Sequence, residues 1–122
     1  DAYRQTQVQS RTPLELVVML YDGALQFMAA AQDAIGCRDI PARKTALSKA
    51  LAIISELQST LNMDQGGDIA RSLDDLYRWA NVRLLDAAVS NDPAPIDEVA
   101  TVFRTLREGW SDLASGDRRE GV

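Results

Sequence analysis

The chain has 122 residues, which is typical of a single domain, and 46% of them are apolar and 25% charged. It contains no histidine and one cysteine, Cys37, which excludes histidine-based catalysis, phosphohistidine relays, histidine-ligated metal sites and an intrachain disulfide framework. The net charge is −5 and no long basic tract occurs, so nucleic acid is a poor partner. No uninterrupted apolar run approaches the roughly 18 residues of a membrane span, and we therefore expect no membrane insertion.

The first expected helix begins after Thr12 and runs to about Ile35. Threonine as N-cap, Pro13 in the first turn and Glu15 three residues after the cap form the pattern of a capping box. Apolar residues cover more than one face of this helix, so we expect it either to be the most buried helix or to face two partners. Gly23 lies in its middle, where glycine is about 1 kcal/mol less favourable than alanine. Close packing against another helix is the structural explanation for that glycine.

Two further segments, about 41–61 and 95–115, each predict a helix with one apolar face. In both, apolar residues recur at spacings of three and four. Asp97 and Glu98 occupy the first turn of the last helix, where negative charge interacts favourably with the helix dipole. The residues that we expect to be buried, one from each of the four helices, are Leu20, Ile54, Leu76 and Phe103.

The segment 68–90 predicts a helix with two apolar stripes. The ordinary core stripe contains Ile69, Leu73, Leu76, Tyr77, Ala80, Leu84 and Ala87. At about 100° per residue, a second stripe points to the opposite side, and it consists of Trp79, Val82, Leu85 and Val89. Either neighbouring helices bury this second stripe, or it forms an exposed groove for a partner helix.

Short connections between the four helices predict an all-α, antiparallel up-down four-helix bundle over residues 12–115. Residues 1–11 are mostly polar, and their only sizeable apolar side chains are Tyr3 and Val8, so we expect a short mobile N-terminal arm. Residues 116–122 are expected to form a flexible tail.

No group of residues predicts catalysis, and we expect no enzyme, no catalytic residue, no cofactor and no metal site. The acidic pairs Asp74-Asp75 and Asp97-Glu98 lack the ligand spacing of a calcium-binding loop and are explained by solvated faces and caps. Cys37 has no histidine to activate it.

Several runs of the sequence together resemble the FliS family of flagellar export chaperones. The first is Leu16-Val17-Val18-Met19-Leu20-Tyr21-Asp22-Gly23, and the last is Leu106-Arg107-Glu108-Gly109-Trp110. Between them lie Gly66-Gly67-Asp68-Ile69-Ala70 and Arg83-Leu84-Leu85-Asp86-Ala87. The order and spacing of these runs hold from about Tyr3 to Trp110.

The resemblance implies a cytosolic chaperone that binds the C-terminal segment of flagellin. In the family, that segment is disordered when free and folds into helices as it wraps around the chaperone. Bound in this way, it cannot polymerise early and is delivered to the flagellar export apparatus, whose gate is a further implied partner. The family's short N-terminal arm contains a tyrosine that can cover part of the site, and Tyr3 is the matching position.

The client-binding residues expected from these observations are Tyr3, Val8, Leu20, Tyr21, Trp79, Val82, Leu85 and Val89. A helical adaptor with an unrelated client is the main alternative function, and a four-helix-bundle enzyme or relay is a weaker one. The expected oligomeric state is a monomer or a weak homodimer.

Overall fold

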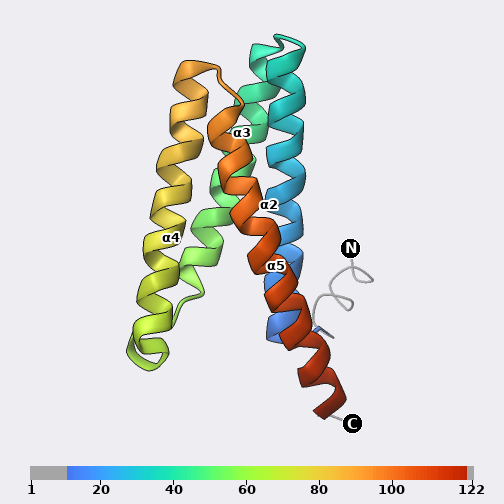
Figure 1. The fold of residues 1–122 in the computed structure, drawn as a ribbon, viewed down its shortest axis with the longest axis vertical. Coiled ribbons are helices and arrows are strands. Elements are labelled where there is room, and N and C mark those ends of the chain that lie inside the picture. The colour runs from blue at the N-terminus through green and yellow to red at the C-terminus, as the bar shows by residue number, and fades with distance from the viewer. Residues whose placement is uncertain (1–10, 121–122) are drawn as a thin grey trace, which may run out of the picture.

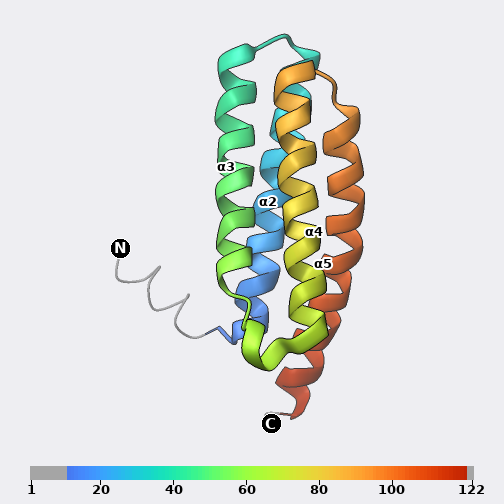
Figure 2. The same cartoon turned by 90° about the vertical axis from the view of Figure 1, so that its left-hand side faces the viewer.

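The structure is a computed structural model that describes residues 11–120, with side chains described through residue 116. It contains α2 (Pro13–Gly36), α3 (Ile40–Ser59), α4 (Met63–Ser90) and α5 (Ala94–Glu120), and these residues include no strand. Figures 1 and 2 show the four helices side by side, with successive helices running in opposite directions. Helices α2 and α4 each pack against both α3 and α5, so α2 and α4 lie diagonally across the bundle. The predicted all-α bundle is confirmed.

Side-chain caps determine where the first three helices begin. The backbone N–H of Glu15 donates to Oγ1 of Thr12 at 3.1 Å, as the sequence predicted. Equivalent hydrogen bonds join the Ala42 N–H to Oδ1 of Asp39 at 3.1 Å and the Gln65 N–H to Oδ1 of Asn62 at 3.0 Å. Each cap satisfies a backbone donor that has no partner within its own helix.

Two helix boundaries differ from those predicted. Helix α4 begins at Met63 rather than at Asp68, because Asn62 caps a first turn that the glycine-rich sequence had suggested was a loop. Gly67 then kinks the helix with a φ of 54°, which is the left-handed region that favours glycine, and Figure 2 shows this first turn at an angle to the rest of α4. Helix α5 continues to Glu120, so residues 116–120 are helical rather than part of a tail.

Aromatic side chains fill the centre of the bundle. Tyr21, Tyr77 and Phe103 are fully enclosed, and the ring centroids of Tyr21 and Phe103 are 5.0 Å apart. Ile54 and Phe103 are 1% and 0% exposed, as predicted. Leu20 and Leu76 are only partly buried against this core, because each lies at the edge of its helix's core-facing side. These two leucines are therefore less buried than predicted.

Gly23 allows α2 and α3 to approach each other closely. A Cβ atom added at Gly23 would lie 3.1 Å from Cδ1 of Ile53, which is tighter than ordinary van der Waals contact. Close packing of α2 against α3, as the sequence suggested, therefore explains why a glycine is present in the middle of α2. Gly109 has no such constraint, because an added Cβ would meet nothing within 4 Å.

Helix α2 is long and apolar enough to cross a membrane by length and composition alone, and it is the one helix of the described residues with this property. The core helix of a bundle meets the same criterion. Helix α2 packs between α3 and α5, and its Asp22 pairs with Arg107 of α5. These contacts are those of a helix inside a bundle.

We predict that Phe103→Ala lowers the free energy of unfolding by about 3–5 kcal/mol, because it removes a fully enclosed aromatic ring and leaves a cavity. Thr105→Ala, on the exposed side of the same helix, is the control and should change stability by no more than about 0.5 kcal/mol. Chemical denaturation measures both. A loss below about 1 kcal/mol for Phe103→Ala would contradict the central position of this ring.

Candidate functional site

The outward-facing side of α4 carries an exposed apolar stripe. It consists of four side chains, with exposed fractions of 37% for Trp79, 57% for Val82, 47% for Leu85 and 90% for Val89. Among the described residues, only α3 and α5 pack extensively against α4, and neither covers this side. The sequence left open whether neighbours bury the second stripe, and in the structure they do not. We call these four residues the outer stripe.

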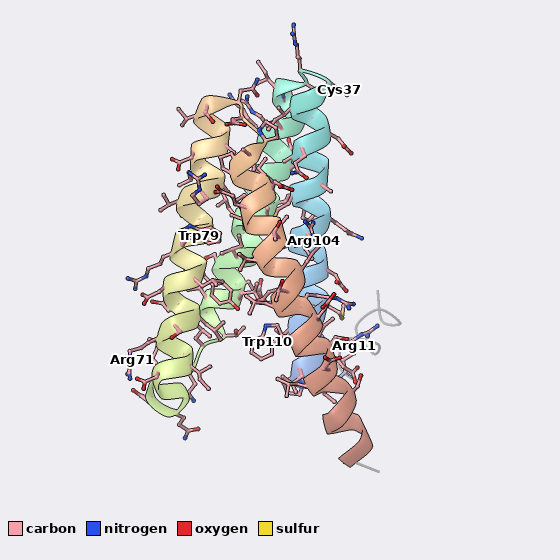
Figure 3. All side chains as sticks on the ribbon, in the orientation of Figure 1. Arg11, Cys37, Arg71, Trp79, Arg104 and Trp110 are labelled. Carbon is pink, nitrogen blue, oxygen red and sulfur yellow. The ribbon has the colours of Figure 1, made fainter. Side chains whose placement is uncertain are left out.

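A second apolar feature is a groove between α4 and α5. Leu73 and Leu76 of α4 form one wall, and Leu106 and Trp110 of α5 form the other. Ile69, Asp68 and Ser72 complete a lining that encloses about 460 Å³. Figure 3 shows Trp110 in the space between the two helices. We call this hollow the α4/α5 groove.

The α4/α5 groove continues into a smaller cavity at the end of the bundle where α4 begins. This cavity encloses about 240 Å³ and shares Ile69, Leu73 and Trp110 with the groove. Its other apolar walls are Val17, Leu57, Leu61, Ala70 and Tyr77. Apolar surface is therefore continuous from the end of the bundle into the groove.

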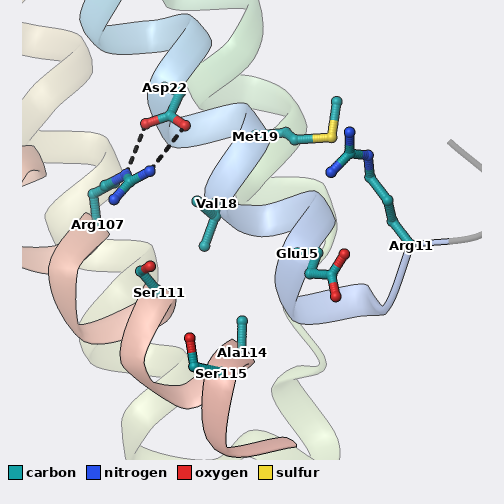
Figure 4. Close-up of a pocket in the computed structure, with 9 residues that line it drawn as sticks. All are labelled: Arg11, Glu15, Val18, Met19, Asp22, Arg107, Ser111, Ala114 and Ser115. Atoms are coloured by element: carbon teal, nitrogen blue, oxygen red, sulfur yellow. Dashed lines mark hydrogen bonds and ion pairs between the residues drawn. The ribbon is translucent and has the colours of Figure 1, made fainter. Parts of the chain in front are cut away.

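A polar pocket lies on the other side of α5, against α2. Figure 4 shows Asp22 and Arg107 paired across it, with Ser111 and Ser115 further along α5. The guanidinium Nε and Nη2 of Arg107 donate to the two carboxylate oxygens of Asp22 at 2.8 and 3.2 Å. These hydrogen bonds raise the pKa of Arg107 above its ordinary value and join α2 to α5. No group of three or more acidic or cysteine side chains in the described part of the chain is placed to hold a metal ion.

The two buried tyrosines form a hydrogen bond across the bundle. The hydroxyl oxygens of Tyr21 on α2 and Tyr77 on α4 are 2.8 Å apart. Burial raises the pKa of both tyrosines above the ordinary value, because the interior disfavours a phenolate. Both hydroxyls therefore stay neutral and can satisfy each other.

The structure separates the predicted client-binding residues into three groups. Trp79, Val82, Leu85 and Val89 lie together on the outer stripe. Leu20 is partly buried against the core, and Tyr21 is fully enclosed. Tyr21 was expected to bind the client, but in the free chain its side chain lies in the core, with its hydroxyl bonded to that of Tyr77. Tyr3 and Val8 lie outside the described residues.

Sequence reasoning did not single out the α4/α5 groove. Leu73, Leu76, Leu106 and Trp110 follow the apolar spacing of their helices, which by itself predicts burial in the core. They line a groove because α4 and α5 are separated near Trp110. The periodicity of a sequence does not give the distance between two helices. The small polar residue Ser72, which lines the groove between Ile69 and Leu76, is the one local signal that this side of α4 is not fully packed.

Comparison with known families decides the identity of the chain. The family model described as flagellar protein FliS matches residues 1–117. The chain belongs to the FliS family.

Named members of the family are similar to nearly the whole chain. The flagellar secretion chaperone FliS of Salmonella typhimurium is 36% identical over 118 residues, which cover 93% of this chain and 87% of the relative. The FliS of Bacillus subtilis is 34% identical over 119 residues, with coverages of 98% and 88%. FliSB of Pseudomonas aeruginosa is 33% identical over 110 residues, with coverages of 90% and 87%. These relatives support a flagellar export chaperone, and the family is a chaperone family rather than an enzyme family.

A solved structure described as a flagellar chaperone from bacteria has the same fold. It superposes with a TM-score of 0.80, covers 94% of each chain and is 21% identical in sequence.

The family-like run Tyr21-Asp22-Gly23 has a structural role at each position. The tyrosine hydroxyl bonds to Tyr77, the aspartate pairs with Arg107, and the glycine admits α3. Three consecutive residues thereby connect α2 to each of the other helices.

We predict that Tyr21 and Tyr77 are energetically coupled. Y77F leaves the Tyr21 hydroxyl buried without its partner and should cost about 1–3 kcal/mol. The double variant Y21F/Y77F removes both polar groups and should be less destabilised than the sum of the single variants. A double-mutant cycle in denaturant measures this coupling, and strictly additive losses would contradict it.

The same pair predicts how stability depends on pH. The unfolded tyrosines ionise near pH 10, whereas burial keeps both neutral in the folded chain. Their contribution to stability is therefore present below about pH 10 and is lost as the pH rises above that value. Y21F/Y77F should show a smaller loss of unfolding free energy above pH 10 than the unmodified chain, and an equal loss in both proteins would contradict this prediction.

Proposed function

We propose that this chaperone binds the C-terminal segment of flagellin in the cytosol, prevents its premature polymerisation and delivers it to the flagellar export apparatus. The observation that carries the proposal is the exposed outer stripe, which places four apolar side chains together on one side of α4. Isolated exposed apolar side chains are ordinary on soluble proteins, but a contiguous apolar surface marks an interaction site. A client segment that folds into amphipathic helices would bury it.

Burial of the outer stripe would contribute several kcal/mol to the free energy of binding. Complete burial of a valine or leucine side chain contributes about 1.5–3 kcal/mol, and the stripe contains three aliphatic side chains and one indole. Part of this gain is offset by the ordering of a client that is disordered when free. The proposed site therefore consists of Trp79, Val82, Leu85 and Val89, with Leu20 at a more distant and partly buried position.

The proposed role of residues 1–11 is a weak cover over part of this site. Tyr3 and Val8 supply the two apolar anchors, and a tyrosine suits the rim of an apolar groove because its hydroxyl can stay near water. Two anchors must offset the ordering of about ten residues, so the cover must be easily displaced.

A helical adaptor with another client is the second candidate function. The same exposed outer stripe would serve it, and the family assignment favours the flagellar client. The proposed oligomeric state is a monomer or a weak homodimer.

We predict that Val82→Asp and Leu85→Asp each weaken binding of the flagellin C-terminal segment by at least about tenfold, since a loss of about 1.4 kcal/mol of apolar burial already has this effect. Both side chains are exposed in the free chain, so the melting temperature should change little. Calorimetric titration and thermal unfolding measure the two effects.

Ile40→Asp is the matched control. Ile40 is also aliphatic and 52% exposed, but it lies at the start of α3 and belongs neither to the outer stripe nor to the α4/α5 groove. This variant should bind like the unmodified chain. If Val82→Asp and Leu85→Asp unfold the bundle, or bind as tightly as Ile40→Asp does, the outer stripe is not the client site.

Deletion of residues 1–11 should leave the melting temperature nearly unchanged and speed association with the flagellin segment, because the covered fraction of the site is removed. Hydrogen exchange on the intact chain gives a direct measurement. Client binding should slow exchange on α4 and speed exchange in residues 1–11. Equally fast exchange of residues 1–11 with and without client would contradict a covering role.

A further inference from the structure

Gly109 lies in the interior of α5, where the free chain does not require a glycine. A Cβ atom added there would meet nothing within 4 Å, unlike one added at Gly23. Gly109 is also not needed for a left-handed backbone, because Gly67 is the one glycine of the described residues with a positive φ. Alanine would therefore fit this position and would favour the helix more than glycine does. The open space beside Gly109 is available to a group from outside the chain.

An ion pair shows which side of α5 carries Gly109. Nη2 of Arg83 on α4 lies 2.6 Å from Oε2 of Glu98 on α5, so these two residues mark the sides on which the two helices face each other. Gly109 follows Glu98 by eleven residues, or about three full turns, and lies on nearly the same side of α5. Ser72 precedes Arg83 by eleven residues and lies on nearly the same side of α4 for the same reason.

Ser72 and Gly109 also lie at the same height in the bundle. Helices α4 and α5 run in opposite directions (Figure 1), so eleven residues back along α4 and eleven residues forward along α5 both cover about 16 Å in one direction. Ser72 lines the α4/α5 groove, and Gly109 directly precedes Trp110, which also lines it. Two small residues therefore occupy the facing sides of α4 and α5 at the groove.

The α4/α5 groove lies where the two helices separate. Figure 1 shows α4 and α5 close together near the connection between them and further apart toward the start of α4. In this wider part, the groove encloses about 460 Å³ between leucine side chains of both helices and the ring of Trp110. Large apolar walls favour an apolar occupant, and a glycine at the edge allows another backbone to approach closely.

Resting on the proposed function, we infer that a helical part of the flagellin segment packs in the α4/α5 groove and makes its closest backbone contact at Gly109. Its apolar side chains then lie between Leu76 of α4 and Leu106 of α5. Trp79 of the outer stripe follows Ser72 by seven residues, so it lies on nearly the same side of α4, two turns further along. The groove and the outer stripe are thus close enough to contact the same client.

A second copy of this chain is a less suitable occupant of the groove. Each copy carries a net charge of −5, and this charge opposes the close association of two copies. The helices of a second copy also use their core-facing sides in their own bundle. A segment that is disordered when free has all its apolar side chains available for the groove.

Filling the space beside Gly109 tests the contact. In Gly109→Leu the new side chain occupies the place of the client backbone, so the flagellin C-terminal segment should bind at least about tenfold more weakly, an effect typical of overpacking at a fitted contact. The melting temperature should stay equal or rise, because leucine favours a helix more than glycine does. A merely structural role for Gly109 would instead lower the melting temperature. Calorimetric titration and thermal unfolding measure the two effects.

Gly36→Leu is the matched control. Gly36 is the last residue of α2, and a Cβ atom added there also meets nothing within 4 Å. This variant should bind the flagellin segment like the unmodified chain. Gly109→Ala adds a single carbon and should weaken binding less than Gly109→Leu does. Ser72→Leu fills the same space from α4 and should weaken binding about as much, so the test does not depend on one variant.

The outcomes separate this contact from the proposed function. If the unmodified chain does not bind the flagellin segment, both fail. If Val82→Asp weakens binding but Gly109→Leu binds as tightly as Gly36→Leu does, the proposed function stands and the contact at Gly109 is wrong.

Two further results would assign the groove to another occupant and overturn the inference. Tighter binding by Gly109→Leu would indicate that another part of this chain fills the groove and is displaced by the new side chain. Self-association of the unmodified chain that Gly109→Leu abolishes, with unchanged client binding, would assign the groove to a second copy. Sedimentation equilibrium measures this self-association.

Discussion

The hydrogen bond between the buried hydroxyls of Tyr21 and Tyr77 is the contact on which the arrangement of the bundle depends. It joins α2 and α4, which lie diagonally across the bundle and pack mainly against α3 and α5 instead of against each other. Two hydroxyls inside an apolar core are costly unless they satisfy each other. The bond can form in only one register of α2 against α4, with Phe103 packed against both rings. This register decides which side of α4 faces the core and which side is left for a partner.

The exposed side of α4 follows from the number of helices. In a ring of four helices, each helix has two neighbours. The side of α4 that faces the core carries the buried residues Tyr77, Ala80 and Leu84. A helix with apolar residues on the opposite side as well has more apolar surface than its own chain can cover. The proposed function accounts for this excess, because a bound client would supply the missing cover. The same excess would favour self-association of a protein without a client.

The sequence predicted the four helices and the Thr12 cap because both depend on local spacing and on a side chain close to the helix start. It also predicted that Trp79, Val82, Leu85 and Val89 share one side of a helix. It did not predict that Tyr21 is enclosed in the core, since periodicity does not reveal that the distant Tyr77 satisfies its hydroxyl. It missed the first turn of α4 because glycine-rich sequence usually breaks helices, whereas here Asn62 supplies a cap. The α4/α5 groove depends on the separation of two helices, which no local pattern encodes.

The proposed function requires the outer face of α4 to bind the flagellin C-terminal segment as that segment folds. Isothermal titration of the full chain with this segment, repeated at several temperatures and paired with circular dichroism, measures both the binding and the folding. We expect saturable binding, a large negative heat-capacity change and a gain of helix beyond the sum of the separate components. Binding without a heat-capacity change or a gain of helix, or no binding at all, would contradict it.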